Sequence, residues 1–452
     1  MISLEFFGIL ILSLILYWVI PKQSLRNLLL ILASFAFIYL LDKWSVVVVL
    51  GLSAVSYLFG VLINKYPKRG WIHACGVILV LGVLILFKYL GFLGGIFNSL
   101  AGFISALPQF EIRKLLLPLG ISYIVFKHIS YLTDIKWGLV KPGRFIDFLF
   151  YSSFFTIFVA GPIERFERFK PQIEQSRLPF SWSNIDYGFM RIVFGMFKKM
   201  VLANWIGYFI SPIWANPHHY DHWIRLLALL GYAFQIYFDF AGYSDIAIGS
   251  SRLFGIKIME NFNNPYLAPN MSQFWRRWHI SLSDWIRDYL FFPLARLKSN
   301  KLWALGFVPV ISMALCGLWH GSAGHFIVWG AWHGLGIALY QSWVLLKKSR
   351  KKYSKRLPKS KYEWFPNIIT FMWVTMGWVF FVEGGLQLAQ SLFNPYSITL
   401  FILLSSVIVY LARALHPLIS IISKRPFSAV YFLILTIILY CSLNTTFIYN
   451  AF

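Results

Sequence analysis

The stretch "WSVVVVLGLSAVSYLFGVLI", residues 44–63, contains no charged side chain and lies between Lys43 and Lys65. A helix of roughly 20 residues crosses a hydrocarbon core about 30 Å thick. Only helices and closed barrels satisfy their backbone hydrogen bonds within lipid. An uncharged run of this length therefore predicts a membrane-spanning helix.

Comparable apolar runs recur along the chain. Hydrophobic residues make up 58% of the 452 residues and charged residues 13%, whereas soluble domains have about 25% charged residues. The apolar segments lie near 4–20, 27–41, 44–63, 72–94, 115–135, 145–163, 187–210, 223–250, 302–319, 325–346, 364–383, 397–416 and 427–447. We predict an all-α, polytopic membrane protein with about 12 transmembrane helices.

Basic residues indicate the orientation of these helices. The formal net charge is +24, and cytoplasmic loops are typically rich in Lys and Arg. Lys65, Lys68 and Arg69 mark one cytoplasmic loop, and "KKSRKKYSKRLPKSK" (347–361) marks another. Threading the chain from these loops places both termini outside. We interpret the charge as a signal for orientation and for contact with anionic lipid, not as a nucleic-acid surface.

One apolar segment does not fit a full crossing. "FIDFLFYSSFFTIFVAGPIERFERFK" (145–170) has basic residues on both flanks, namely Lys141, Arg144, Arg165, Arg168 and Lys170. We predict that it is re-entrant and turns back at or near Gly161-Pro162. Irregular backbone at membrane depth requires surrounding protein or a water-filled cavity. The segment therefore suggests a central cavity or tunnel.

A charged cluster follows in "FWRRWHISLSDWIRDYLFFPL" (274–294). Helical spacing places five mainly apolar residues on one face of a helix and four charged residues on another. On the charged face Asp284 could pair with Arg287. These sets are Trp275, Trp278, His279, Leu282 and Ile286, and then Arg277, Asp284, Arg287 and Asp288. Ser272 and either Ser281 or Ser283 are candidate N-caps. We expect an interfacial helix on the cytoplasmic side.

Histidines mark a second candidate site in "GLWHGSAGHFIVWGAWHG" (317–334). Each of His320, His325 and His333, taken alone, is more typical of a packing residue than of a catalyst. Gly317, Gly321 and Gly324 favour a functional role for His320, because glycines allow a backbone or ligand to approach closely and they interrupt the helix. Ionisable groups within spans are expensive and often functional.

Carboxylates mark a third site in "YFDFAGYSDIAIG" (237–249), with Asp239, Tyr243, Ser244 and Asp245 inside an apolar segment. We expect Arg276, Arg277 or a protonated histidine as partners. A structural ion pair and a role in aligning a catalytic base both remain open.

Other motifs limit the chemistry. The loop "NPHHYDHW" (216–223) groups three histidines and an aspartate, but we expect no metal site there. The chain contains no HExxH, Walker A, GxGxxG, GxSxG or CxxC motif, which argues against hydride transfer, nucleotide hydrolysis and serine-hydrolase chemistry. The remaining interpretation is a membrane-embedded histidine system that removes a proton from a hydroxyl group.

At these motifs the sequence resembles the membrane-bound O-acyltransferase family, and within it the bacterial O-acetyltransferases of alginate and peptidoglycan. The D-alanyl transferases of teichoic acid synthesis share the outline. The resemblance runs through the stretches "RNLLLILASFAFI" (26–38), "LPLGISYIVFKHISYLTDI" (117–135), "FVAGPIERF" (158–166), "YFDFAGYSDIAIG", "NFNNPY" (261–266), "FWRRWHISLSDWIRDYLFFPL" and "GLWHG".

The resemblance implies the roles of individual residues. His320 would be the catalytic base and His279 would hydrogen-bond the thioester or oxyanion, while Arg276 and Arg277 would attract coenzyme A phosphates. Trp319 and the polar group of the third site, Asp239, Tyr243, Ser244 and Asp245, would be supporting residues. The resemblance also implies one membrane-embedded domain, 1–452, with N-terminal helices 1–163, a catalytic core 164–346 and C-terminal helices 347–452.

The expected function is transfer of an acetyl group from cytosolic acetyl-CoA, with no tightly bound cofactor, to an extracytoplasmic polysaccharide. The transfer would be direct or through a periplasmic partner, at a bacterial inner membrane. Alternatives are D-alanyl or longer-chain acyl transfer, a lipid or polysaccharide transporter, and a scaffold for a periplasmic transferase. A transporter would usually show inverted repeats, and the sequence shows no internal repeat.

Overall fold

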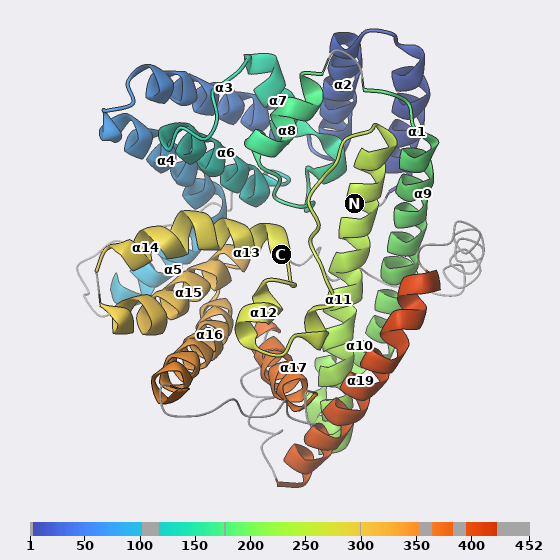
Figure 1. The fold of residues 1–452 in the computed structure, drawn as a ribbon, viewed down its shortest axis with the longest axis vertical. Coiled ribbons are helices and arrows are strands. Elements are labelled where there is room, and N and C mark those ends of the chain that lie inside the picture. The colour runs from blue at the N-terminus through green and yellow to red at the C-terminus, as the bar shows by residue number, and fades with distance from the viewer. Residues whose placement is uncertain are drawn as a thin grey trace. The chain divides into compact units, whose positions relative to one another are not determined.

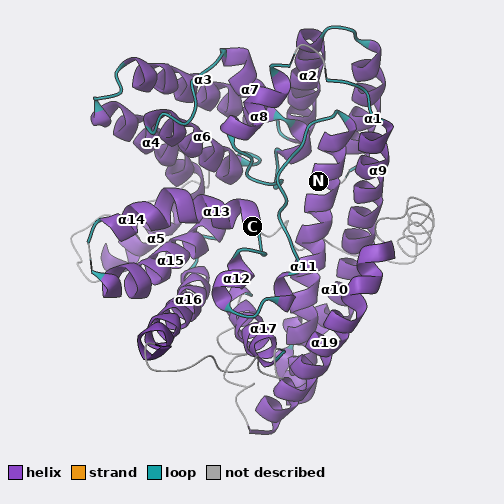
Figure 2. Ribbon diagram, in the orientation of Figure 1, coloured by secondary structure: helices purple, strands orange, loops and turns teal. Residues whose placement is uncertain are grey.

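The computed structural model describes residues 3–101, 117–175, 178–298, 300–351, 364–382 and 395–422. The chain divides into two compact units, Met1–Phe189 with Ala247–Met259, and Met190–Ile246 with Glu260–Phe452. All regular elements in the described ranges are helices (Figure 2). The all-α prediction is therefore confirmed. The division at residues 163 and 346 stays a prediction.

The first unit contains the N-terminal helices (Figure 1). These are α1 (Leu4–Val19), α2 (Gln23–Leu41), α3 (Lys43–Lys65), α4 (Gly70–Leu84), α5 (Leu90–Ala101), α6 (Ile121–Lys136), α7 (Phe145–Ser153) and α8 (Phe166–Ile173). Two long helices, α9 (Trp182–Met196) and α11 (His222–Leu253), begin or end in this unit and continue into the other.

The second unit contains the middle of the chain and its C-terminal part. Its other helices are α10 (Asn204–Ala215), α12 (Met271–Trp275), α13 (Ile280–Ile286), α14 (Phe292–Arg296), α15 (Val308–His320), α16 (Gly324–Lys351), α17 (Phe365–Trp378) and α19 (Pro395–Ile422). Short π-helical turns extend or join several of them, at Ile85–Tyr89, Phe197–Ala203, Arg287–Phe291 and Trp303–Phe307.

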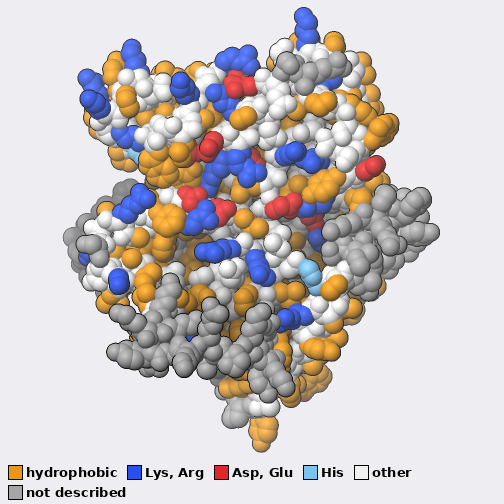
Figure 3. All heavy atoms as spheres, in the orientation of Figure 1, with side chains coloured by type: hydrophobic (Ala, Val, Ile, Leu, Met, Phe, Trp, Pro, Cys, Tyr) orange, Lys and Arg blue, Asp and Glu red, His pale blue; other side chains and the backbone are white. Residues whose placement is uncertain are grey.

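Six of the described helical stretches are long and apolar enough to cross a membrane. They are Gln23–Leu41, Lys43–Lys65, Gly70–Ser99, His222–Leu253, Trp303–His320 and Tyr396–Pro417, and three shorter apolar stretches are Leu4–Val19, Phe145–Ile157 and Phe365–Phe381. Hydrophobic side chains cover much of the exposed surface in Figure 3, as expected for helices that face lipid. The count of about 12 crossings stays a prediction, since segment 427–447 lies outside the described residues.

The segment predicted to be re-entrant is interrupted. Helix α7 ends at Ser153, and residues 158–165 form irregular backbone whose residues are all buried. The chain then packs back on itself, because α8 contacts α7 and the Tyr151 hydroxyl donates to the Glu164 carbonyl oxygen at 2.8 Å. The structure thus places irregular backbone inside protein, as the sequence suggested, and its depth in the membrane stays a prediction.

Helices α15 and α16 pack closely against each other as a hairpin in the second unit. A Cβ atom on Gly317 would lie 1.9 Å from the Phe326 carbonyl oxygen, and one on Gly330 would lie 2.0 Å from that of Met313. Glycines are therefore required on both helices for their backbones to lie this close together. The interruption at residues 321–323 confirms the expected helix break beside His320.

Candidate active site

Residues 274–294 do not form the single helix expected from their spacing. Helix α12 ends at Trp275, a turn follows, and α13 begins at Ile280. The expected N-caps are also wrong: Asn270 caps α12 by accepting from the Gln273 amide at 2.8 Å, and His279 occupies the N-cap position of α13. The predicted Asp284–Arg287 ion pair is confirmed at 2.5 Å.

The turn places His279 in a rare backbone conformation. Its φ is +43°, and Asn264 is the other non-glycine residue with positive φ in the described ranges. The left-handed region costs a non-glycine residue roughly 1–2 kcal/mol. Such strain persists only when the surrounding contacts fix it, and at His279 one residue makes several of these contacts.

That residue is Asn261, the first of the "NFNNPY" stretch, for which no role was predicted. Its Oδ1 accepts from the Ser281 amide at 3.2 Å, from the Ser281 hydroxyl at 2.8 Å and from Nδ1 of His279 at 3.1 Å. Its amide nitrogen donates to Ser244 Oγ at 3.1 Å, and its carbonyl oxygen accepts from the Ile280 amide at 2.9 Å. Asn261 is fully buried, so it holds both the turn and the imidazole.

This network determines the tautomer of His279. A backbone amide can only donate, so the contact with Ser281 identifies the Asn261 atom as the oxygen. Nδ1 of His279 must then carry the proton, and Nε2 of the neutral ring has a free lone pair. Nε2 is buried and makes no hydrogen bond within the described part of the chain. A neutral His279 is therefore an acceptor at Nε2, whereas the donor role expected from the sequence requires an imidazolium.

Burial keeps that imidazole neutral. His279 is 1% exposed, and burial lowers its pKa well below the usual value, with a further contribution from nearby His320. A buried cation without a counter-ion is disfavoured. The ring also packs edge-on against Phe240, at 4.6 Å between centroids.

His320 lies at the end of α15, in an aromatic setting. Its ring centroid is 4.8 Å from that of Trp319, 5.0 Å from Trp329 and 5.4 Å from Phe381. Trp319 also contacts His279, at 6.5 Å. The structure thus brings His279, Trp319 and His320 together, as expected, although they are separated by about 40 positions in the sequence.

The two other histidines of the glycine-rich stretch have different surroundings. His325 Nδ1 lies 3.0 Å from the Phe380 carbonyl oxygen. His333 is fully buried among aromatic rings, and neither of its nitrogens makes a hydrogen bond within the described residues. These rings belong to Phe274, Trp275, Trp329 and Trp378. His333 therefore has a packing role without the hydrogen bond typical of a buried imidazole.

The expected partners of the α11 carboxylates are wrong. Asp239 pairs with Lys199 at 2.6 Å, and Asp245 pairs with Lys198 at 2.6 Å and Arg191 at 2.5 Å. Arg276 is exposed instead, and Arg277 donates to the Leu267 carbonyl oxygen at 3.2 Å. The lysines lie in the π-helical turn Phe197–Ala203 between α9 and α10, which packs against α11. Two adjacent lysines inside an apolar segment were a visible signal for this pairing.

The carboxylates of α11 differ in their connection to His279. Arg191 bridges Asp245 to Glu260, the residue before Asn261, at 2.8 Å, and Ser244 accepts from Asn261 itself. Ser244 and Asp245 therefore help to hold the segment that orients the imidazole. Asp239 is 3% exposed and forms a separate buried pair, while Tyr243 is buried on the same helix. No group of three or more His, Cys, Asp or Glu residues in the described ranges could hold a metal ion.

Comparison with known proteins places this chain in a family. Residues 138–399 match the model of MBOAT, the membrane-bound O-acyltransferase family. This match includes α15, α16 and the turn with His279. The chain belongs to the membrane-bound O-acyltransferase family. It is therefore an O-acyltransferase and a multi-pass membrane protein.

Relatives extend the likeness beyond the matched region. The probable alginate O-acetylase AlgI of Pseudomonas syringae is 34% identical over 381 residues, which cover 82% of this chain and 70% of that protein. The peptidoglycan O-acetyltransferase of Helicobacter pylori is 31% identical over 72% of this chain and 64% of its own length. The teichoic acid D-alanyltransferase of Bacillus subtilis is 33% identical over 61% of this chain and 71% of its own length.

Proposed function

We propose that this membrane-bound O-acyltransferase passes an acetyl group from cytosolic acetyl-CoA to a hydroxyl of an extracytoplasmic polysaccharide similar to alginate or peptidoglycan, directly or through a periplasmic partner. The membrane would be a bacterial inner membrane. The names of two relatives support the acetyl group and the polysaccharide. The observation that supports the chemistry is Nε2 of His279, a buried acceptor nitrogen beside His320.

In the proposed reaction His320 accepts the proton of the acceptor hydroxyl while the hydroxyl oxygen attacks the thioester carbonyl carbon. A C–O bond forms, the C–S bond breaks, and the same proton passes to the departing thiolate. General base catalysis of this kind typically contributes about 10²–10⁴-fold. Arg276 and Arg277 would bind the donor phosphates by charge-assisted hydrogen bonds. Because Arg276 is exposed and Arg277 only partly buried, both side chains are accessible to a soluble donor.

The tautomer of His279 favours a second assignment of the two roles. Neutral His279 presents a lone pair at Nε2, so it can accept the hydroxyl proton, and His320 would then stabilise the oxyanion as a donor. Both assignments use the same pair of imidazoles and the same bond changes. They differ in which imidazole must be a base.

Substitution by glutamine separates the roles. A glutamine amide can donate where imidazole Nε2–H donates, but it cannot act as a base. If His320 is the base, His320→Gln should be as inactive as His320→Ala, and His279→Gln should retain more activity than His279→Ala. The reverse order would assign the base to His279. The measurement is mild-base release of O-acetyl groups from cell polysaccharide, with the amount of membrane-inserted protein determined in parallel.

Full activity in both alanine variants would contradict the proposed function. The same assay tests the D-alanyl alternative that one relative suggests, because mild base then releases D-alanine instead of acetate. The matched control is His333→Ala, since His333 lies outside the proposed chemistry and is packed among aromatic rings. It should lower protein amount rather than activity per molecule.

A further inference from the structure

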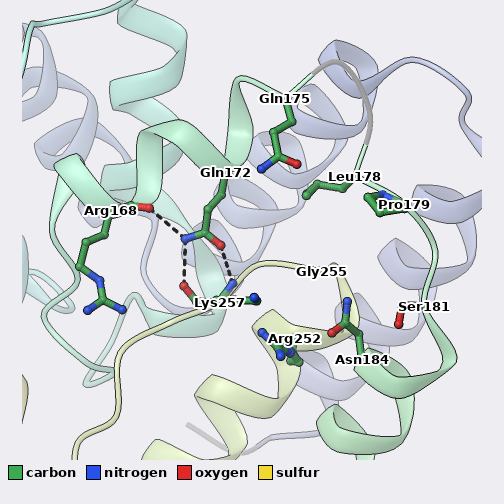
Figure 4. Close-up of a pocket in the computed structure, with 10 residues that line it drawn as sticks. All are labelled: Arg168, Gln172, Gln175, Leu178, Pro179, Ser181, Asn184, Arg252, Gly255 and Lys257. Carbon is green, nitrogen blue, oxygen red and sulfur yellow. Dashed lines mark hydrogen bonds between the residues drawn. The ribbon is translucent and has the colours of Figure 1, made fainter.

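The first unit contains a pocket that acyl transfer does not explain. Its volume is about 620 Å³, within the range of roughly 300–1,000 Å³ typical of small-molecule sites. Figure 4 shows that its walls come from α8, the end of α11 with the segment that follows it, and the start of α9. All of these residues belong to the first unit.

The charge of the pocket is positive. Arg168, Arg252 and Lys257 line it, and no lining residue is acidic. Arg168 pairs with the buried Glu164 at 3.2 Å, whereas Arg252 and Lys257 form no ion pair within the described residues. The Arg252 guanidinium lies 5.3 Å from the Tyr187 ring centroid, and its Nε is buried without a hydrogen bond there. Two uncompensated cations beside neutral polar groups favour an anionic ligand.

Hydrogen bonds fix the walls of the pocket. The Gln172 amide nitrogen donates to the carbonyl oxygens of Arg168 and Lys257, both at 3.0 Å, and its oxygen accepts from the Lys257 amide at 2.7 Å (Figure 4). On the opposite side the Leu178 amide donates to Gln23 Oε1 at 3.0 Å. The carbonyl oxygen of Leu178 accepts from the buried Arg26 guanidinium, also at 3.0 Å. The backbone that carries Arg168 and Lys257 is therefore preformed, which lowers the entropic cost of binding.

An aromatic row marks the depth of the pocket in the membrane. Leu178 and Pro179 line the pocket, and Phe180 and Trp182 continue from them with exposed fractions of 48% and 72%. The rings of Trp18, Phe180 and Trp182 follow one another at centroid distances of 5.0 Å. Exposed tryptophans and a basic pocket at a helix end are typical of the level of lipid headgroups.

We propose that this pocket binds the phosphate headgroup of an anionic phospholipid from the cytoplasmic leaflet. The basic residues that follow 145–163 place this side of the unit in the cytoplasm, where anionic headgroups are available. The volume exceeds that of a single phosphate and suits a glycerophosphate headgroup. A soluble phosphate compound has the same charge chemistry. The exposed aromatic row favours the lipid, because these rings can lie against its acyl chains.

The test uses the full-length purified protein in a neutral detergent and native mass spectrometry. Phosphatidylglycerol should remain bound to the wild-type protein, and phosphatidylcholine should not. The double variant Arg252→Gln/Lys257→Gln should bind phosphatidylglycerol at least about 100-fold more weakly, because two charge-assisted contacts are lost. The matched control Lys65→Gln/Lys68→Gln removes two exposed cations of the same unit outside the pocket, and it should bind the lipid as the wild type does.

Two further arms decide the source of the phosphate. Coenzyme A and inorganic phosphate, added separately, should leave bound phosphatidylglycerol in place, and displacement by either would overturn the lipid assignment. Equal lipid binding by the pocket variant, or equal loss in the control variant, would overturn the site. If the double variant does not fold, the exposed Lys257→Glu variant replaces it, with the same expected loss. Activity is not the readout, so the outcome does not depend on the proposed acetyl transfer.

Discussion

Asn261 Oδ1 lies 3.1 Å from Nδ1 of His279, and this one contact leaves Nε2 as the basic nitrogen of a buried imidazole. The contact joins the segment after α11 to the turn before α13. Nothing in the local sequence of either segment predicts this contact. An amide oxygen fixes the ring without charging it, whereas a carboxylate at the same position would favour the imidazolium.

The Asn261→Asp variant should shift the pH dependence of activity. If neutral His279 is the base, the lowering of its pKa by burial should let the wild type keep its activity until well below the ordinary histidine pKa of about 6.5. The new carboxylate should raise that pKa and move the acidic limb of the pH–rate profile to higher pH. The control is Asn263→Asp, at an exposed neighbouring position, which should leave the profile unchanged. An identical acidic limb in Asn261→Asp and wild type would contradict the role of this contact.

The glycine crossing of α9 and α11 should not tolerate a methyl group. A Cβ atom on Gly242 would lie 2.6 Å from the Gly195 carbonyl oxygen and 2.9 Å from the Lys199 amide nitrogen. Gly242→Ala should destabilise the protein by about 1–3 kcal/mol through overpacking. Thermal unfolding in detergent measures this, with Gly51→Ala on α3 as control, since nothing lies within 4 Å of its Cβ position. Equal unfolding temperatures in the two variants would show that the crossing can relax.

The Lys199–Asp239 pair should show strong coupling. Lys199→Met leaves the Asp239 carboxylate buried without its partner, which typically costs about 3–5 kcal/mol. The double variant Lys199→Met/Asp239→Leu should recover most of that loss, because no charge remains buried. The measurement is a double-mutant cycle on thermal unfolding and on inserted protein. Additive losses would mean that the two side chains act independently.

Arg276 and Arg277 should affect donor use rather than folding. Their replacement by glutamine should raise the apparent KM for acetyl-CoA, because each charge-assisted phosphate contact contributes about 1.5–3 kcal/mol. Arg296→Gln removes an exposed cation from α14 and is the control. Since Arg277 also donates to the Leu267 carbonyl oxygen, the single Arg276→Gln variant separates donor binding from local structure. An unchanged KM in Arg276→Gln would remove Arg276 from the donor site.

The sequence could predict those features that depend on neighbouring residues. The uncharged run 44–63 forms α3, Lys43–Lys65, because its composition alone determines a helix in lipid. The glycines around His320 end α15 where expected. The resemblance implied roles for His279, Trp319 and His320, and the structure brings these three side chains together.

Features that depend on distant residues were not predicted. The single helix predicted for 274–294 was wrong because Asn261, which lies outside this stretch, holds the turn at His279 through hydrogen bonds that local spacing cannot indicate. The partners of Asp239 and Asp245 lie on another helix. Even there, Lys198 and Lys199 were present in an apolar segment, and matching buried cations to buried carboxylates would have identified both pairs.

Under the proposed function, the left-handed backbone at His279 favours activity at a cost in thermal stability. An imidazole at φ +43° is a poor conformational choice, and glycine adopts that region without penalty. His279→Gly should therefore relieve local strain while it removes the proposed acyl-transfer group, although part of that gain is offset by the packing lost against Phe240. If His279 takes part in acyl transfer as proposed, selection for thermal stability alone would tend to replace it.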